Sequence, residues 1–281
     1  MALSILISSW SAILIFALLV RSKYRWTRPP YQTFIVFAAA GVLSTLPAIA
    51  VNSFLGENTA LWFLSPDPLK SGLGFMIGAG FGEELCKMLS GIAVLILIFQ
   101  PRALYASVTA LVTLLALAAW HYLGWEPSID SPLALLPIIA MIAFVSVLVR
   151  PTLSDADCVL GFVIVGLAFA VVENLYSYSD LPVHHLLVRG LMAVPLHAAM
   201  GMVQGVAVRS ARRRKAAWPL FFGYLFAVAC HTGWDLAASL PGQLQEWVLV
   251  PGCVLMILVC VRVWKLVPEV EVDDLAYQHA A

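Results

Sequence analysis

Residues 159–176, which read VLGFVIVGLAFAVVENLY, decide the class of fold. The stretch carries no charge before Glu173. As an α-helix that rises about 1.5 Å per residue it would be about 27 Å long, which is close to the ~30 Å thickness of the hydrocarbon core of a bilayer. The stretch therefore predicts a helix that crosses a membrane.

The rest of the chain has the same character. Of its 281 residues, 62% are hydrophobic and 11% are charged, whereas a soluble domain has roughly 45–50% apolar and about 25% charged residues. This composition excludes a soluble globular protein, a disordered chain and a nucleic-acid-binding protein. It indicates a multi-pass membrane protein that is surrounded by lipid.

We expect an all-α, polytopic bundle of nine transmembrane helices, because nine stretches are long and apolar enough to span a bilayer. The predicted spans are residues 3–20, 34–54, 72–99, 103–123, 133–149, 159–176, 186–208, 218–239 and 247–264. The connections are short. We therefore expect one transmembrane domain over residues 1–266, with its motif-bearing core at 72–239, and a short acidic cytoplasmic tail at 267–281.

The basic residues are sorted along the chain. Of 16 Lys and Arg residues, 13 lie in alternate connections or at the end of the last span, and the opposite connections hold Lys70 alone. Because positive loops stay on the cytoplasmic side, we expect the N-terminus outside and the C-terminus inside, in the plasma membrane. This orientation requires an odd number of spans.

Several ionisable residues lie inside the predicted spans. A charged side chain at the bilayer centre costs roughly 2.5–3.5 kcal/mol even on insertion scales, so such residues usually face the protein interior and serve its function. The eight are Glu83, Glu84, Lys87, Glu173, Arg189, His197, His231 and Asp235. They fall on four of the nine spans, which predicts one polar cluster in the middle to outer half of the membrane.

Local spacing suggests how these residues meet. On a helix Glu83 and Glu84 point about 100° apart, and Lys87 falls between them, where it can neutralise either one. Gly80 is expected to leave a notch for water above the two carboxylates. Pro195 lacks an N–H group and is expected to bend its span just before His197.

Two mechanisms of water activation are open for such a cluster. A buried Glu can act as general base while His residues bind a metal or stabilise an oxyanion. Catalytic zinc takes three N or O ligands, and His197, His231 and Glu84 form the tentative set for Zn²⁺. No H-E-x-x-H motif is present, so a metal site would be assembled across helices, and a glutamic mechanism without metal is the alternative.

The motifs resemble a known family. Residues 82–87 (GEELCK), residues 169–176 (FAVVENLY), His197 and residues 231–235 (HTGWD) are similar, in this order, to the motifs of the PrsW-type intramembrane proteases. These are distantly similar to the CAAX prenyl endopeptidase and Abi group. In that group the first and last motifs read E-E-x-x-x-R and H-x-x-x-N, from which Lys87 and Asp235 depart, so prenylated substrates are not expected.

The resemblance implies hydrolysis of a peptide bond in a membrane-anchored protein, for example an anti-sigma factor, near its extracytoplasmic side. It implies a catalytic set of Glu83, Glu84, His197, His231 and Asp235. One Glu would polarise the water, His197 would hold that water or a metal, and His231 with Asp235 would bind the metal or the oxyanion. The supporting residues would be Lys87, Glu173, Asn174 and Arg189.

Two other classes of protein could use the same residues. In a proton- or cation-coupled transporter, the buried carboxylates and histidines would form a relay. A transporter favours internal repeats, and we find none in the sequence. In a non-catalytic membrane scaffold, the polar cluster would serve folding alone.

Overall fold

The computed structural model describes residues 2–24, 28–63, 65, 68–99, 153–178, 182–240, 243–265 and 267–268, and every secondary-structure element in these ranges is a helix. The elements are α1 (Ala2–Lys23), α2 (Tyr31–Phe63), α3 (Pro68–Phe75), η1 (Met76–Glu83), α4 (Glu84–Phe99), α7 (Asp155–Tyr178), α8 (Val183–Val188), η3 (Arg189–Ala193), α9 (Val194–Arg214), α10 (Trp218–Ala238) and α11 (Gln243–Lys265). The predicted spans at 103–123 and 133–149 and the tail beyond residue 268 lie outside the described residues.

The predicted all-helical fold is confirmed. Within the described residues, five helices are long and apolar enough to cross a membrane: Leu6–Lys23, Tyr31–Asn52, Asp155–Tyr176, His185–Arg214 and Val248–Lys265. Two further predicted spans correspond to the rod α3–η1–α4 and to α10, which carry several of the ionisable residues. The number nine and the orientation of the termini remain predictions.

The outer surface of the bundle is apolar, as a lipid environment requires. Leu14 on α1, Phe222 on α10 and Leu255 on α11 are 60–64% exposed. A soluble monomer rarely exposes apolar side chains over such a wide area. The exposed apolar faces therefore agree with a multi-pass membrane protein.

Two rods of the bundle contain a π-helical segment. η1 runs directly into Glu84 at the start of α4, and η3 runs into α9 just before Pro195. A π-helical turn holds one more residue than an α-turn and is frequent at functional sites. The sequence predicts a bend at Pro195, and the structure has the π-helical segment η3 in the turn before it. The proline ring crowds the carbonyl group of Leu191 four residues earlier, which accounts for the irregular turn there.

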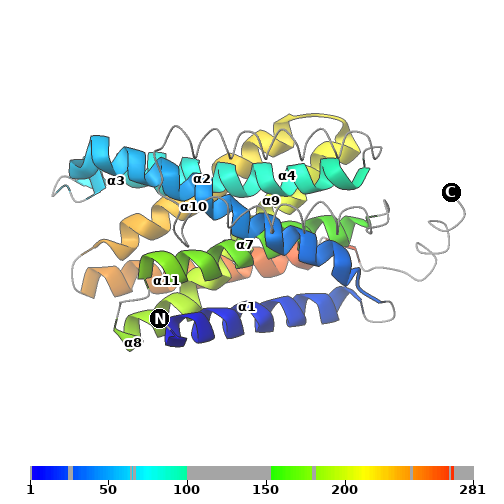
Figure 1. Cartoon of the computed structure of the whole chain (residues 1–281), viewed down its shortest axis with the longest axis horizontal. Coiled ribbons are helices and arrows are strands. Elements are labelled where there is room, and N and C mark those ends of the chain that lie inside the picture. Colours follow the sequence, from blue (N-terminus) through cyan, green and yellow to red (C-terminus); the bar gives the residue numbers. More distant parts are fainter. Residues whose placement is uncertain are drawn as a thin grey trace, which may run out of the picture.

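Helix α7 lies in the middle of the bundle and packs against α1, α2, α4 and α9 (Figure 1). Its contact with α9 is made by the backbones of both helices. A Cβ atom at Gly166 would collide with the carbonyl oxygen of His197, and one at Gly201 would collide with the carbonyl oxygen of Phe162. Glycine at these positions lets the two helices approach closely, and this fixes the height of His197 against α7.

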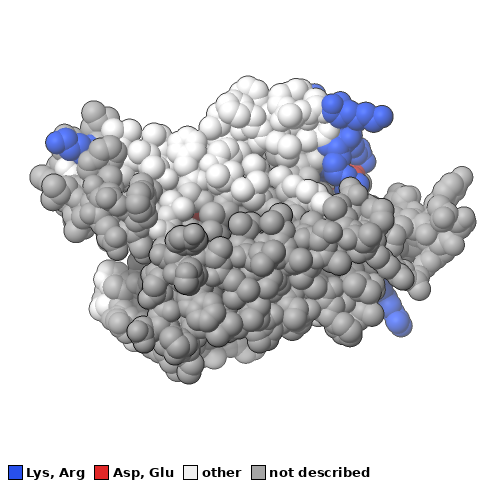
Figure 2. Space-filling model, turned by 45° about the horizontal axis from the view of Figure 1, so that its top comes forward, with Lys and Arg blue, Asp and Glu red and all other residues white. Residues whose placement is uncertain are grey.

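Several helix ends with basic residues meet at one end of the bundle. α1, α9 and α11 each have Lys or Arg in the last turn. Trp264 Nε1 donates a hydrogen bond to Ser22 Oγ at 2.8 Å, and Arg209 Nε lies 2.7 Å from Asp155 Oδ2 at the start of α7. Figure 2 shows most of the visible basic side chains at the right-hand end, and a smaller basic group at the left-hand end. This sorting agrees with the positive-inside interpretation of the sequence.

Candidate active site

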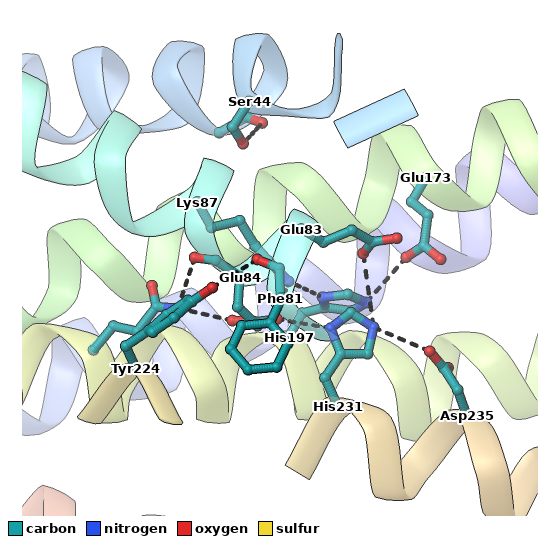
Figure 3. A network of polar contacts seen from close by, with 12 residues as sticks. Ser44, Phe81, Glu83, Glu84, Lys87, Glu173, His197, Tyr224, His231 and Asp235 are labelled. Atoms are coloured by element: carbon teal, nitrogen blue, oxygen red, sulfur yellow. Dashed lines mark hydrogen bonds and ion pairs between the residues drawn. The ribbon is translucent and has the colours of Figure 1, made fainter. Parts of the chain in front are cut away.

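The ionisable residues predicted to cluster do lie together in the structure. Glu83 ends η1, and Glu84 and Lys87 lie in the first turn of α4. Glu173 and Asn174 come from the last turns of α7, Arg189 begins η3, His197 lies on α9, and His231 and Asp235 lie on α10. Figure 3 shows the carboxylates arranged around the two imidazole rings, whose centroids are 5.2 Å apart.

Glu84 is the most enclosed residue of the site, with no exposed surface. Its Oε1 accepts hydrogen bonds from the ammonium group of Lys87 and from His231 Nδ1, the latter at 2.8 Å. Its Oε2 accepts a hydrogen bond from Gln204 Nε2 at 2.8 Å, and the same amide also donates to the Glu84 backbone carbonyl at 3.2 Å. Both carboxylate oxygens of Glu84 are therefore engaged.

Glu83 has a different environment from its neighbour. Its Oε1 accepts a hydrogen bond from Asn52 Nδ2 at 2.9 Å, whereas its Oε2 is buried and has no hydrogen-bond partner among the described residues. Glu83 Oε2 lies 3.7 Å from His231 Nε2. Lys87, which the sequence allows to neutralise either glutamate, pairs with Glu84, three residues earlier on the regular helix α4.

The two histidines present their ring nitrogens to different groups. His231 directs Nδ1 to Glu84, and its Nε2 lies 3.6 Å from Asp235 Oδ2, which is too long for a hydrogen bond. His197 has Nδ1 at 3.1 Å from Lys87 Nζ and Nε2 at 3.0 Å from Glu173 Oε2. The latter contact lacks hydrogen-bond geometry, since Glu173 Oε2 has no hydrogen-bond partner.

A chain of polar contacts connects the site to α1. Arg189 Nη2 lies 3.0 Å from Glu173 Oε1, and Arg189 Nε donates to Asn174 Oδ1 at 2.7 Å. Asn174 Nδ2 in turn donates to Ser8 Oγ at 2.9 Å. Arg189 thus holds Glu173 and Asn174 together and, through Asn174, links them to Ser8 on α1.

The carboxylates differ in exposure, and the order shows from which side the site is reached. The exposed fraction of the side chain is 0% for Glu84, 8% for Glu83, 15% for Glu173 and 22% for Asp235. Asp235 is in the last turn of α10 and Glu173 is near the end of α7, away from the basic end of the bundle. Water therefore reaches the cluster most easily from the end opposite the basic residues.

The notch expected at Gly80 is not open. Gly80 is buried against α10, and a Cβ atom there would collide with Thr232 Oγ1 and lie 3.2 Å from Val228 Cγ1. The absence of a side chain lets η1 pack closely against α10, so the glycine brings Glu83 towards His231. It does not provide a path for water.

Two amides in the site were missed by a search for ionisable residues. Asn52 on α2 holds Glu83, and Gln204 on α9 holds Glu84. Gln204 lies seven residues after His197, two helical turns along the same face. A search for any strongly polar side chain inside an apolar span would have found both.

The three tentative ligands do not fit a metal ion in this arrangement. Glu84 has both oxygens engaged by Lys87, His231 and Gln204, and His197 has neighbours at both ring nitrogens. In the part of the chain that the structure describes, no group of three or more His, Cys, Asp or Glu side chains is arranged to hold a metal ion.

A family model for "PrsW family intramembrane metalloprotease" matches residues 134–264. The match includes Glu173, His197, His231 and Asp235 and begins after the Glu83–Glu84 pair. Neither the curated proteins nor the solved structures gave a significant match.

The helical membrane fold and this match together define the class: the chain is an enzyme, a membrane-embedded peptidase. Over residues 134–264 the chain is similar to the PrsW family, as the order of its motifs predicts. The match favours this class over a transporter.

Proposed function

We propose that this protein cleaves a peptide bond of a membrane-anchored protein near the extracytoplasmic side, with Glu83 as the general base that activates water. An anti-sigma factor is a suitable example of the substrate. The proposal extends the family match to a substrate class and assigns distinct roles to the two adjacent glutamates.

One observation carries the assignment to Glu83. Four buried polar side-chain atoms in the described residues lack a hydrogen-bond partner: Asn52 Oδ1, Glu83 Oε2, Glu173 Oε2 and Thr232 Oγ1. All four belong to site residues or to direct neighbours of site residues. Buried polar atoms are nearly always paired, so their concentration here marks the part of the protein that is suited to bind water or a polar substrate group.

The geometry supports a general-base reaction at Glu83. The 3.7 Å between Glu83 Oε2 and His231 Nε2 allows one water molecule to contact both atoms. Glu83 takes a proton from this water, and the water oxygen attacks the carbonyl carbon of the peptide bond. The proton then passes from Glu83 to the peptide nitrogen as the C–N bond breaks, which yields a carboxylic acid and an amine.

The remaining side chains hold these groups in place. Glu84 accepts the Nδ1–H of His231 and so orients its ring, which directs Nε2 towards Glu83 and Asp235. The oxyanion that forms on the carbonyl oxygen requires an N–H donor, which the His197 ring supplies. Arg189 and Asn174 hold Glu173 and the end of α7 at the more exposed side of the site.

The accessible side of the cluster supports cleavage near the extracytoplasmic surface. The carboxylates become more exposed towards Asp235 and Glu173, at the end opposite the basic residues. With the predicted orientation, that end faces away from the cytoplasm. A polypeptide segment that unwinds at this depth would meet Glu83 from the outer side.

The test is Glu83→Gln, which keeps the shape of the side chain and removes the base. In cells that also produce a doubly tagged single-span membrane protein, such as an anti-sigma factor, we expect cleavage to fall by roughly 10²–10⁴-fold. Asp155→Asn, the same chemical change at the basic end, is the matched control and should cleave normally. Unchanged processing by a correctly inserted Glu83→Gln variant would remove Glu83 from the mechanism.

A further inference from the structure

The ammonium group of Lys87 lies between Glu84 and His197. It donates a hydrogen bond to Glu84 Oε1, lies 3.1 Å from His197 Nδ1, and lies 4.5 Å from the centre of the Phe169 ring. Lys87 is 2% exposed and His197 is 3% exposed, so little water competes for this contact. The three groups that contact the ammonium group are thus a carboxylate oxygen, a ring nitrogen and an aromatic face.

This contact decides where the proton of the His197 ring lies. A lysine ammonium group has three donors and no acceptor. His197 Nδ1 must therefore accept the hydrogen bond with its lone pair, and the ring proton of the neutral imidazole then lies on Nε2. A neutral ring has one donor and one acceptor nitrogen, and the partner of one nitrogen fixes the other.

The opposite nitrogen of His197 faces the accessible part of the site. Nε2 lies 3.0 Å from Glu173 Oε2, in a contact that does not meet hydrogen-bond geometry. An N–H group at this position is close to an acceptor without being well aligned to it. It remains available to donate to a carbonyl oxygen of a bound peptide.

We propose that Lys87 is a positioning residue that holds His197 in the tautomer with its proton on Nε2, so that His197 acts as the N–H donor to the substrate oxyanion. The role in the reaction rests on the proposed function. The tautomer itself does not, because it follows from the contacts of the resting protein. In this arrangement His197 Nδ1 is engaged by Lys87 and Nε2 carries a proton, so neither nitrogen has a lone pair for a metal.

The tautomer can be measured directly by long-range ¹H–¹⁵N NMR of the purified full-length protein with ¹⁵N-labelled histidine. His197→Asn identifies the signals of the ring. We expect Nδ1 of His197 in the range of unprotonated nitrogen and Nε2 in the range of protonated nitrogen. A hydrogen bond from a charged donor should favour this tautomer by roughly tenfold to a hundredfold.

Two variants separate Lys87 from the other neighbour of the ring. Lys87→Met removes the donor and should shift His197 to a mixture of tautomers. Lys87→Gln keeps an N–H donor and should restore the original signals. Glu173→Gln changes the group near Nε2 and should leave Nδ1 unprotonated.

Three results would overturn the proposal: a proton on Nδ1 in the unsubstituted protein, no change in Lys87→Met, or a change in Glu173→Gln of the size expected for Lys87→Met. The spectrum of the unsubstituted protein decides the first point even if a variant fails to fold. None of these results depends on cleavage, so failure of this proposal and failure of the proposed function are distinguishable. If the tautomer is as proposed but Glu83→Gln still cleaves, the proposed function fails alone.

Discussion

Removal of Glu84 should destabilise the folded protein far more than removal of Glu83, although the two residues are adjacent and chemically identical. Glu84 accepts hydrogen bonds from Lys87, His231 and Gln204, whereas Glu83 accepts one from Asn52. In Glu84→Ala the buried Lys87 ammonium group loses its carboxylate. Loss of one partner of a buried ion pair costs roughly 3–5 kcal/mol, whereas loss of the Asn52 hydrogen bond in Glu83→Ala costs about 1 kcal/mol.

Thermal unfolding in detergent provides the assay, with a dye that reacts with cysteine thiols as they become exposed. Cys158 is fully buried in α7 and reports the separation of the helices. At about 2–4 °C per kcal/mol, the scale for soluble domains of 150–250 residues, Glu84→Ala should lower the melting temperature by roughly 6–20 °C. Glu83→Ala removes the same volume and should lower it by a few degrees.

A double variant tests the physical reason. If the cost arises from the unpaired Lys87 cation, Glu84→Ala with Lys87→Met should be more stable than Glu84→Ala alone, because interacting residues are not additive. Equal melting temperatures for Glu84→Ala and Glu83→Ala would refute the reasoning. A double variant no more stable than Glu84→Ala would show that the ion pair is not the cause.

Two further predictions concern packing and metal. Gly201→Ala should destabilise the protein, because the added Cβ atom would collide with the backbone of Phe162. In the control Gly233→Ala the Cβ atom meets nothing within 4 Å, so stability should be unchanged or should rise by up to about 1 kcal/mol through helix propensity. Equal unfolding temperatures for the two variants would contradict the close contact of α7 and α9. Since both carboxylate oxygens of Glu84 are engaged and neither ring nitrogen of His197 offers a lone pair to a metal, treatment with a chelator should leave the cleavage rate unchanged. A loss of cleavage that Zn²⁺ restores would contradict this arrangement.

The sequence predicts the polar cluster because charged residues are costly in a membrane and therefore have to share an interior. Glu83, Glu84, His197 and His231 stand out against apolar neighbours, and the structure places the first three next to His231. This part of the prediction needs the identity of the residues and the length of the spans. It does not depend on the exact path of each helix.

The pairing within the cluster could not be predicted, because it depends on the path of the helix at the level of a single turn. A regular α-helix allows Lys87 to reach either glutamate, and only the positions of the side chains in the structure show that it pairs with Glu84. The hydrogen bonds from Asn52 and Gln204 depend on which helices pack next to each other. A helix that is apolar on all sides does not show in its sequence which face packs against which other helix. The sequence likewise does not show that Gly80 is covered by α10.

The absence of side chains at the glycines where α7 meets α9 has a mechanical consequence. Where Gly166 and Gly201 bring the two backbones into contact, neither helix can slide along the other without steric overlap. Glu173 on α7 and His197 on α9 are thus held in a fixed position relative to each other. If the site opens to admit a polypeptide, the movement has to come from helices outside this pair, such as α10. Such a movement would displace His231 and Asp235 while α7 and α9 keep their relative position.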